Sequence, residues 1–395
     1  MEVTIRTITL GIGDAHPLRA EALARAAAFL GQAREAAEAA GYDVQTLRFA
    51  ARPLLEDLAD WADADIEEYA RTLQAACDEL DVGYCSLGPA PADNPSFPPE
   101  RIGLLPRIVA PNAALNATVH LATRPHGIRY AAALPTAEAM RELAESSAGE
   151  ANFRFAALAW CEPDGPFFPQ AFTRGPGWTV SVGLQSAGLV ERTIAACAER
   201  AGTATATLER LPDAVGGALR MAARPVVALV RRLATDAGHR FAGIDLSPAP
   251  MGEESIAAAI EAAGLGRFGE PGTLAVAAAL TAAIKSTALP TCGYCGLMLP
   301  VLEDQLIGER CTEGSFGVSA LLAYSAVCGT GLDTVPIPGH TPPERVAALL
   351  LDVAALAARL RKPLSARLFL VPGGRAGELT DFASPYLTNT RILPV

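Results

Sequence analysis

The fold is decided by an alternation near the start of the chain: EVTIRTITL at residues 2–10, LRAEALARAAAFLGQAREAAEAA at residues 18–40 and DVQTLRF at residues 43–49. The first and third stretches are short and have the apolar spacing of strands. The middle stretch is alanine-rich and helical in character, and Gly41 directly after it is a suitable C-cap. A strand, a helix and a second strand in this order predict parallel strands joined by a helical crossover.

The same alternation continues through most of the chain. Further strands are predicted at residues 82–87, 153–160, 179–184, 239–246 and 365–372, with a strand-like stretch at 203–209 and short apolar segments at 114–122 and 129–133. Helices are predicted at residues 64–80, 136–146, 189–201, 225–237, 253–263, 274–287 and 343–360. Residues 316–327 fit either a helix or a buried strand, and a glycine-rich turn follows them.

The whole chain is predicted to fold as one unit. No Ser/Gly-rich linker or block of charge divides the 395 residues, and no repeat of fixed period occurs. We therefore expect a single large α/β domain over residues 1–395, with its sheet closed or nearly closed into a barrel. The proline-rich connection at residues 94–111 fits this pattern least well and is a candidate surface excursion.

Composition limits the classes of function. Half of the residues are hydrophobic, so the chain can bury a large core. The net charge of -11 argues against nucleic-acid binding, which needs a basic face. No apolar run is long enough for a membrane span, no targeting segment opens the chain, and the eight scattered cysteines predict free thiols. We expect a cytoplasmic protein with a small-molecule ligand, whose alanine-rich helices are suited to packing in a homo-oligomer.

Ligands of α/β proteins bind outside the carboxyl ends of strands, and polar or glycine-rich residues follow several predicted strands. Asp245 ends one of them, two prolines follow it, and a helix begins near Glu253. An acidic residue in this position is a candidate metal ligand or general base. In the alternative interpretation, Ser247 and Glu253 only help to begin the next helix.

A second candidate is TCGYCG at residues 291–296, which contains Cys292 and Cys295. A second CxxC is absent, so a structural zinc site is not indicated, and the two thiols are either a reactive pair or buried packing. Glu303 and Asp304 follow the apolar stretch after this motif. Adjacent charges there must be solvated, paired or bound to a metal.

A third candidate is the glycine-rich stretch 328–340, which offers Gly331, Asp333 and His340. Backbone amides in such a loop can hold an anion, although the same residues also suit a plain turn before the next helix.

The fourth candidate, Gly373-Gly374-Arg375, follows the last predicted strand and resembles an anion-binding turn beside a guanidinium; a simple turn near the end of the chain is the alternative. The fifth is Arg154, which lies between apolar neighbours and needs a partner if it is buried.

Together these residues predict an enzyme that acts on a small anionic metabolite with a divalent metal. Oxygen ligands favour Mg²⁺ or Mn²⁺ over zinc, and such a metal polarises a carbonyl or phosphoryl group. The predicted metal ligands are Asp245, Glu303, Asp304 and Asp333; the predicted catalytic residues are Asp245, Glu303, Asp333, His340, Cys292 and Cys295; and the predicted substrate-binding residues are Arg154, Gly331, Gly373, Gly374 and Arg375. The alternatives are thiol or radical chemistry through Cys292 and Cys295, and a non-catalytic small-molecule sensor.

Several long motifs resemble one family throughout the chain. They are IRTITLGI at residues 5–12, NFRFA at 152–156, PFFP at 166–169, VGLQSAGLV at 182–190, CGYCGLMLP at 292–300 with Glu303-Asp304, GLDTVPIPG at 331–339 and KPLSARL at 362–368. Together they resemble domain-of-unknown-function family number 711. The resemblance implies a fold similar to the α/β barrel of pyruvate formate-lyase, and no established activity.

Glycyl-radical enzymes with that barrel use a cysteine on a central loop and a glycine near the C-terminus in an Arg-Val-x-Gly-aromatic context. Here Gly377 is the corresponding glycine, and Cys292 or Cys295 would be the loop thiol. The motif departs from the pattern, because Ala376 replaces valine, the spacing is one residue short and Glu378 is not aromatic. These departures argue against radical chemistry.

Overall fold

The computed structural model of the chain describes residues 3–395, and its centre is one sheet of ten strands. The strands are β1 (Thr4–Gly11), β2 (Val44–Ala50), β3 (Tyr84–Ala90), β4 (Leu115–Thr123), β5 (Gly127–Ile128), β6 (Phe155–Ala159), β7 (Thr179–Gln185), β8 (Arg240–Ala249), β9 (Gly331–Pro338) and β10 (Leu364–Val371). Their order is β8-β7-β1-β2-β3-β4-β6-β10-β9, and β5 pairs with β4 outside this path. The predicted α/β class is confirmed.

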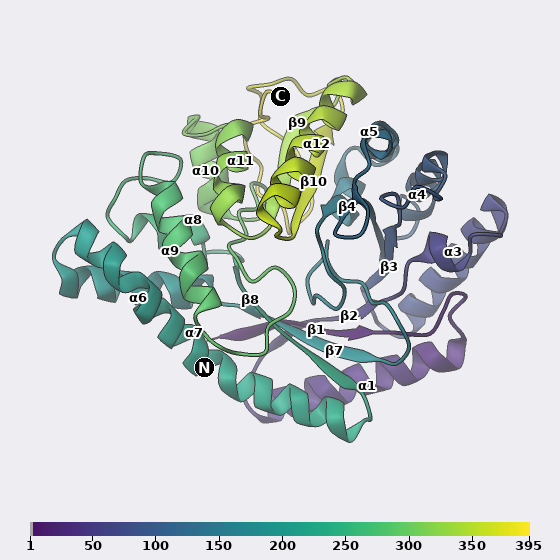
Figure 1. The fold of residues 1–395 in the computed structure, drawn as a ribbon, viewed down its shortest axis with the longest axis horizontal. Coiled ribbons are helices and arrows are strands. Elements are labelled where there is room, and N and C mark those ends of the chain that lie inside the picture. The colour runs from purple at the N-terminus through teal and green to yellow at the C-terminus, as the bar shows by residue number, and fades with distance from the viewer. Residues whose placement is uncertain (1–2) are drawn as a thin grey trace.

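The helices connect the strands and surround them, so that Figure 1 shows an outer ring of helices around an inner sheet. They are α1 (Ala20–Ala39), α2 (Leu54–Asp57), α3 (Asp63–Glu79), α4 (Leu104–Val109), α5 (Ala133–Ser147), α6 (Ala187–Ala201), α7 (Ala204–Asp236), α8 (Ile256–Glu261), α9 (Thr273–Lys285), α10 (Gln305–Glu313), α11 (Val318–Val327) and α12 (Pro343–Leu360). Three short 3-10 helices lie at Pro99–Gly103, Tyr130–Ala132 and Glu150–Arg154. No helix within residues 3–395 is long and apolar enough to cross a membrane.

The strands form groups of opposite direction. β1, β2, β3, β4 and β6 are mutually parallel, whereas β7 runs antiparallel to β1 and β10 runs antiparallel to β6. β8 is parallel to β7, and β9 is parallel to β10. We call the end of the sheet with the amino-terminal ends of the five-strand group the amino rim. The opposite end is the carboxyl rim.

The two edge strands of the sheet are β8 and β9. Thr291 forms an isolated parallel bridge with Ile244 of β8, and Pro300 forms one with Asp333 of β9. The segment 291–300 therefore contacts both edges of the sheet. Closure into a barrel, and the likeness to the pyruvate formate-lyase barrel, stay predictions.

The core explains why these residues form strands and helices. Seven of the eight positions of β10 and all eight of β9 are buried, as expected for strands covered on both faces. Helix α1 turns one side toward the sheet, where Leu23, Ala26 and Leu30 are buried at a spacing of three and four residues. Small alanine side chains let such helices approach the strands closely.

The strand predicted at residues 203–209 is wrong. These residues begin α7, a helix of 33 residues. The Thr203 side chain accepts a hydrogen bond from the Ala206 amide and so caps this helix. Threonine repeated at every second residue imitated a strand, whereas packing of α7 against α6 and α9 favours the helix. The helix predicted at 225–237 corresponds to the last third of α7.

The glycine-rich turn predicted after residue 327 is also corrected, because residues 331–338 form β9. Its two prolines, Pro336 and Pro338, are compatible with a strand at the end of the sheet order, where one side needs no ladder donors. Residues 318–327 form helix α11 rather than a strand. The connection at 94–111 lies at the surface mainly in its first part, because residues 104–109 form a largely buried short helix, α4. The first predicted strand is β1, and its predicted first residue, Glu2, lies outside the described residues.

Candidate functional site

Asp245 anchors a turn rather than facing an open site. Its carboxylate is fully buried and accepts hydrogen bonds from the amides of Tyr294 at 2.8 Å and Cys295 at 3.1 Å. The amide and hydroxyl of Ser247 donate to it at 2.9 and 2.6 Å. Burial raises the pKa of Asp245, and these donors oppose the rise. The bonds from Tyr294 and Cys295 hold the turn 291–296 against β8, and those from Ser247 are local to β8, so the predicted catalytic and metal-binding roles of Asp245 have no geometric support.

Cys292 and Cys295 lie in that turn as free, half-buried thiols. The Cys295 thiol donates to the Cys292 carbonyl oxygen at 3.3 Å. Burial, and next the negative charge of Asp245, raise the pKa of both thiols well above the ordinary value. Since the thiolate is the nucleophile, this environment disfavours the thiol chemistry predicted for the pair.

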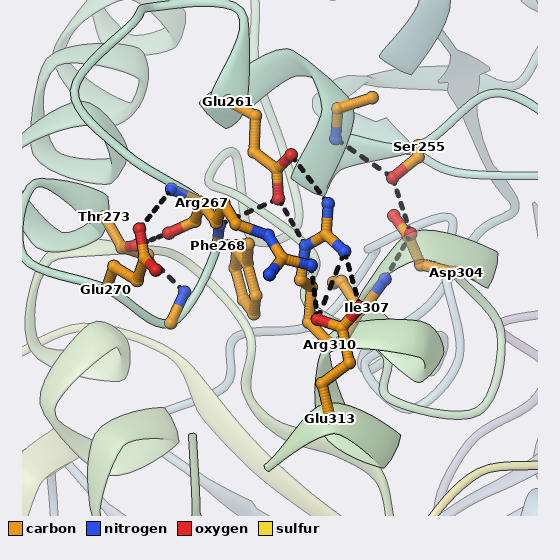
Figure 2. A network of polar contacts seen from close by, with 12 residues as sticks. Ser255, Glu261, Arg267, Phe268, Glu270, Thr273, Asp304, Ile307, Arg310 and Glu313 are labelled. Carbon is orange, nitrogen blue, oxygen red and sulfur yellow. Dashed lines mark hydrogen bonds and ion pairs between the residues drawn. The ribbon is translucent and has the colours of Figure 1, made fainter. Parts of the chain in front are cut away.

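Asp304 is a helix cap. Its carboxylate accepts hydrogen bonds from the Ser255 hydroxyl at 2.6 Å and from the Ile307 amide at 3.0 Å, as Figure 2 shows. The Ile256 amide donates to its other oxygen at 2.7 Å. Asp304 therefore joins the beginnings of α8 and α10, where negative charge is stabilised. Both oxygens are engaged in these bonds, so the geometry gives no support to the predicted role of Asp304 as a metal ligand.

Figure 2 also shows an ion-pair network beside this cap. Arg310 of α10 binds the Glu261 carboxylate of α8 through two nitrogens, at 2.7 and 2.9 Å, and Glu313 joins it at 3.2 Å. The network fixes α8 against α10, and so supports the cap that Asp304 forms between the same two helices.

Glu303 and Asp333 do converge, as predicted, but on an arginine. Arg367 of β10 contacts the Glu303 carboxylate at 2.5 Å and the Asp333 carboxylate at 2.7 Å. All three side chains are largely buried. Burial raises the pKa of Glu303, which Arg367 opposes; burial also works against the charge of Arg367, but the two carboxylates raise its pKa overall.

This ion-pair cluster lines a cavity near the amino rim. An inner space of about 60 Å³ is bounded by Glu303, Asp333 and Arg367, and an outer one of about 330 Å³ is bounded by Gln305 and Tyr386 among others. The residues that line both spaces are Arg6, Arg48, Tyr84, Phe153, Pro250 and Glu303. We call the combined space the arginine cavity.

Two guanidinium groups in the arginine cavity have no counter-ion. Arg48 of β2 is 8% exposed, and its only described hydrogen bond is from Nε to Thr46 at 3.1 Å. Arg6 of β1 donates to Gln45 at 2.8 Å. Among residues 3–395, neither arginine lies within 4.0 Å of a carboxylate. Burial lowers the pKa of Arg48 to about 10. Two cations that make no ion-pair contact beside a cavity favour an anionic ligand.

The rest of the wall is aromatic. The Arg48 guanidinium lies over the Tyr84 ring at 4.5 Å, and the Arg367 guanidinium lies 4.9 Å from the Phe153 ring and 5.8 Å from the Phe168 ring. Such contacts hold the guanidinium planes in place and offer an apolar surface beside the charges. The cavity suits a small molecule with an anionic group and a compact apolar part.

Arg154 and Gly331 have structural roles outside this cavity. One terminal nitrogen of Arg154 donates to the carbonyl oxygens of Val109, Asn112 and Leu115 at 2.5 to 3.0 Å, which ties the 3-10 helix Glu150–Arg154 to the end of α4. Gly331 has a φ of +96°, and an added Cβ would collide with the Ser365 backbone. The close approach of β9 to β10 therefore explains this glycine, and anion binding does not.

The remaining predicted residues line neither part of the arginine cavity. Gly373, Gly374 and Arg375 form the turn after β10, where the Arg375 amide donates to the Glu378 carboxylate at 2.8 Å and the Arg375 side chain is exposed. His340 is exposed after β9. Gly377 lies in an exposed turn.

The four predicted metal ligands do not gather into one ligand set. Asp245 anchors a turn, Asp304 caps helices, and Glu303 and Asp333 bind Arg367. No group of three or more His, Cys, Asp or Glu side chains that could hold a metal occurs in the part of the chain that the structure describes. Of the four predicted metal ligands, only Glu303 and Asp333 therefore lie together.

Sequence reasoning missed three residues of this cavity, Arg6, Arg48 and Arg367. The signal was present for all three, because Arg6, Arg48 and Arg367 lie within predicted strands of a sheet expected to be buried. A buried cation is unfavourable unless it is paired or binds a ligand. An arginine within a buried strand is therefore as strong a candidate site residue as an acidic residue that follows a strand.

Comparison with known proteins gives the following matches. The family model described as Uncharacterised ACR (DUF711) matches residues 1–384. A UPF0210 protein of Pyrobaculum islandicum is 34% identical over 291 residues, 71% of this chain and 62% of that protein. A UPF0210 protein of Desulforudis audaxviator is 30% identical over 381 residues, 90% of this chain and 80% of that protein. The chain spans between 52% and 62% of the length of three Pyrobaculum relatives.

Proposed function

Since the chain belongs to the DUF711 family, described as uncharacterised, its function rests on its own site: we propose that it is an enzyme that binds a small carboxylate in the arginine cavity. The ligand's carboxylate pairs with Arg48 and Arg6. Its apolar part lies against the aromatic wall. Glu303 exchanges a proton with the ligand.

The observation that carries this proposal is the pair of guanidinium groups without counter-ions. Arg48 is 8% exposed and burial lowers its pKa, so the folded chain holds this charge in an unfavourable place. A carboxylate that enters the cavity removes part of that cost through charge-assisted hydrogen bonds. Arg367, which has two carboxylate partners, does not need a ligand for this purpose.

Glu303 is the best candidate for proton transfer, because it lines both parts of the cavity. Burial raises its pKa, and a carboxyl group with a raised pKa works closer to neutral pH as an acid or base. Arg367 fixes its orientation and limits the rise in pKa. Arg367 is therefore a positioning residue in this proposal.

The binding step is tested with Arg48→Met. Acetate, malonate, succinate, benzoate and inorganic phosphate are titrated against the wild-type chain by calorimetry. At least one carboxylate is expected to bind, and Arg48→Met should weaken its binding by about 10- to 100-fold, because one charge-assisted hydrogen-bond pair is lost. Arg375→Met is the matched control, since Arg375 is exposed outside the cavity.

Equal affinities in the wild-type chain and Arg48→Met would refute the proposed binding mode. So would a loss of affinity in Arg375→Met as large as that in Arg48→Met. No binding of any of the five anions to the wild-type chain would also count against the proposal.

The enzyme and the non-catalytic sensor are separated by Glu303→Gln, which keeps the size of the side chain and removes its proton transfer. For an enzyme, this variant still binds the carboxylate but loses turnover. For a sensor, the wild-type chain binds the same carboxylate and leaves it chemically unchanged. The predicted need for Mg²⁺ or Mn²⁺ is tested by activity after EDTA treatment; undiminished activity would contradict it.

We further propose that the segment 291–300 closes the sheet into a barrel. Its two ends carry the isolated bridges to β8 and β9, and the Cys292 amide donates to the Ile244 carbonyl oxygen at 3.1 Å. The Val301 amide donates to the Asp333 carbonyl oxygen at 3.1 Å. These contacts are too few for a full strand, but they occupy both edges of the sheet.

A further inference from the structure

The carboxyl rim holds a second cavity that shares no lining residue with the arginine cavity. Its volume is about 220 Å³, and its polar lining includes Asp93, His120, Thr123, His126, Trp160 and Arg174. We call it the dyad pocket. The strands place the two cavities apart: Tyr84 opens β3 in the arginine cavity, and Asp93 follows the end of β3 in the dyad pocket.

An aspartate and a histidine form a hydrogen-bonded pair in this pocket. The Asp93 side chain is 6% exposed, and its Oδ2 lies 2.7 Å from His126 Nδ1 and 2.6 Å from the Thr123 hydroxyl. A carboxylate only accepts, so His126 carries a hydrogen on Nδ1, and in the neutral form of the ring Nε2 is the acceptor. No partner of Nε2 occurs within residues 3–395. The pair thus presents an oriented, unused acceptor.

The floor of the pocket contains buried donors without partners. Neither ring nitrogen of His120 makes a hydrogen bond of good geometry in the described chain, although the Cys161 backbone lies near the ring and the residue is only 2% exposed. The indole Nε1 of Trp160 is also buried and unpaired. Burial lowers the pKa of His120 to about 4, so the ring is neutral at pH 7 and supplies one donor and one acceptor. Buried polar groups are normally satisfied, so two neighbouring exceptions in one cavity indicate a missing partner.

The mouth of the pocket holds two arginines, each paired with a glutamate that also lines the pocket. Arg174 lies 3.2 Å from Glu56, and both side chains are more than 40% exposed. Arg124 lies 3.3 Å from Glu162 in an exposed pair. Exposed ion pairs of this kind are weak and can rearrange around an incoming anion.

We propose that the dyad pocket is a second ligand site, for a small hydroxycarboxylate. The carboxylate of the ligand accepts the N–H groups of Trp160 and His120. Its hydroxyl donates to Nε2 of His126. This arrangement uses the two unpaired donors and the free acceptor at once, which a simple carboxylate cannot do.

The three tryptophans give a direct test in the full-length chain. Indole ¹⁵N–¹H signals of Trp61, Trp160 and Trp178 are followed by NMR, and Trp61 and Trp178 lie outside the pocket as internal controls. Glycolate and lactate are compared with acetate and propionate, which lack the hydroxyl. The hydroxy acids should shift the Trp160 signal saturably and bind about tenfold more tightly than their matched acids, because one hydrogen bond is added.

Two variants separate the parts of the proposal. His120→Phe should abolish the shift, and His126→Gln should remove the preference for hydroxy acids while acetate still binds. The unchanged Trp61 and Trp178 signals report that each variant is folded. The proposal is overturned if no probe shifts the Trp160 signal, if all three indole signals move together, or if His120→Phe responds like the wild-type chain.

Discussion

Replacing His120 by phenylalanine is expected to make the protein more resistant to acid. Burial lowers the pKa of His120 to about 4, against an ordinary value of 6.5. Between these two values the unfolded chain binds a proton on this ring and the folded chain does not, so stability falls as pH falls. From pH 7.5 to 5.0 the loss amounts to about 2 kcal/mol, since the full 1.36 kcal/mol per pH unit applies only between the two pKa values. Phenylalanine removes this loss and keeps the edge contact with Phe172.

The assay is urea unfolding at pH 7.5 and pH 5.0. His16 also has a pKa lowered to about 4, but it is present in both proteins and cancels in the comparison. At pH 7.5, His120→Phe should be about 1 kcal/mol more stable than the wild-type chain, because unpaired buried nitrogens are removed. His120→Gln is the control: it also loses the titration but keeps buried polar atoms, so it should gain only at pH 5.0. The reasoning is refuted if the wild-type chain and His120→Phe lose equal stability between the two pH values.

Two further predictions concern the turn that Asp245 anchors. Gly293→Ala should destabilise the protein by about 2 kcal/mol or more in urea unfolding, because φ is +73° and an added Cβ would collide with the Asp245 carboxylate. Gly252→Ala is the control: it lies at a positive φ in open space and should destabilise the protein by only about 1 kcal/mol. Equal losses would contradict this account. Cys292→Ser and Cys295→Ser should keep carboxylate binding and any turnover unchanged, since burial keeps both thiols protonated; a loss of turnover in either variant would restore thiol chemistry.

The order of strands and helices could be predicted because apolar periodicity is a local property. The prediction failed where two local signals in the sequence favoured different elements. Glycine and proline around residues 331–338 indicated a turn, yet a strand at the end of the sheet order tolerates the prolines and the close packing explains Gly331. Alternating threonines after Thr203 imitated a strand, yet that residue is a helix cap.

The site was harder to predict, because its residues come from distant parts of the chain. Glu303 and Asp333 were predicted together, but their common partner Arg367 was not. The sequence also could not show that Glu303 and its neighbour Asp304 have different roles. Glu303 faces the cavity, whereas Asp304, one residue later, caps a helix. Likewise, His120 lies within an apolar segment, and only the surroundings show that its nitrogens have no partner.

The opposed directions of the strand groups have a practical consequence for protein engineering. A seven-residue strand such as β3 covers about 23 Å, and the charges at its two ends are separated by nearly three Debye lengths at physiological ionic strength. Exposed charges that are changed in loops at one end are therefore largely screened from the other end by dissolved ions, whereas buried charges are not. Specificity at either end can be redesigned by changing loops there, with the shared β-framework left untouched.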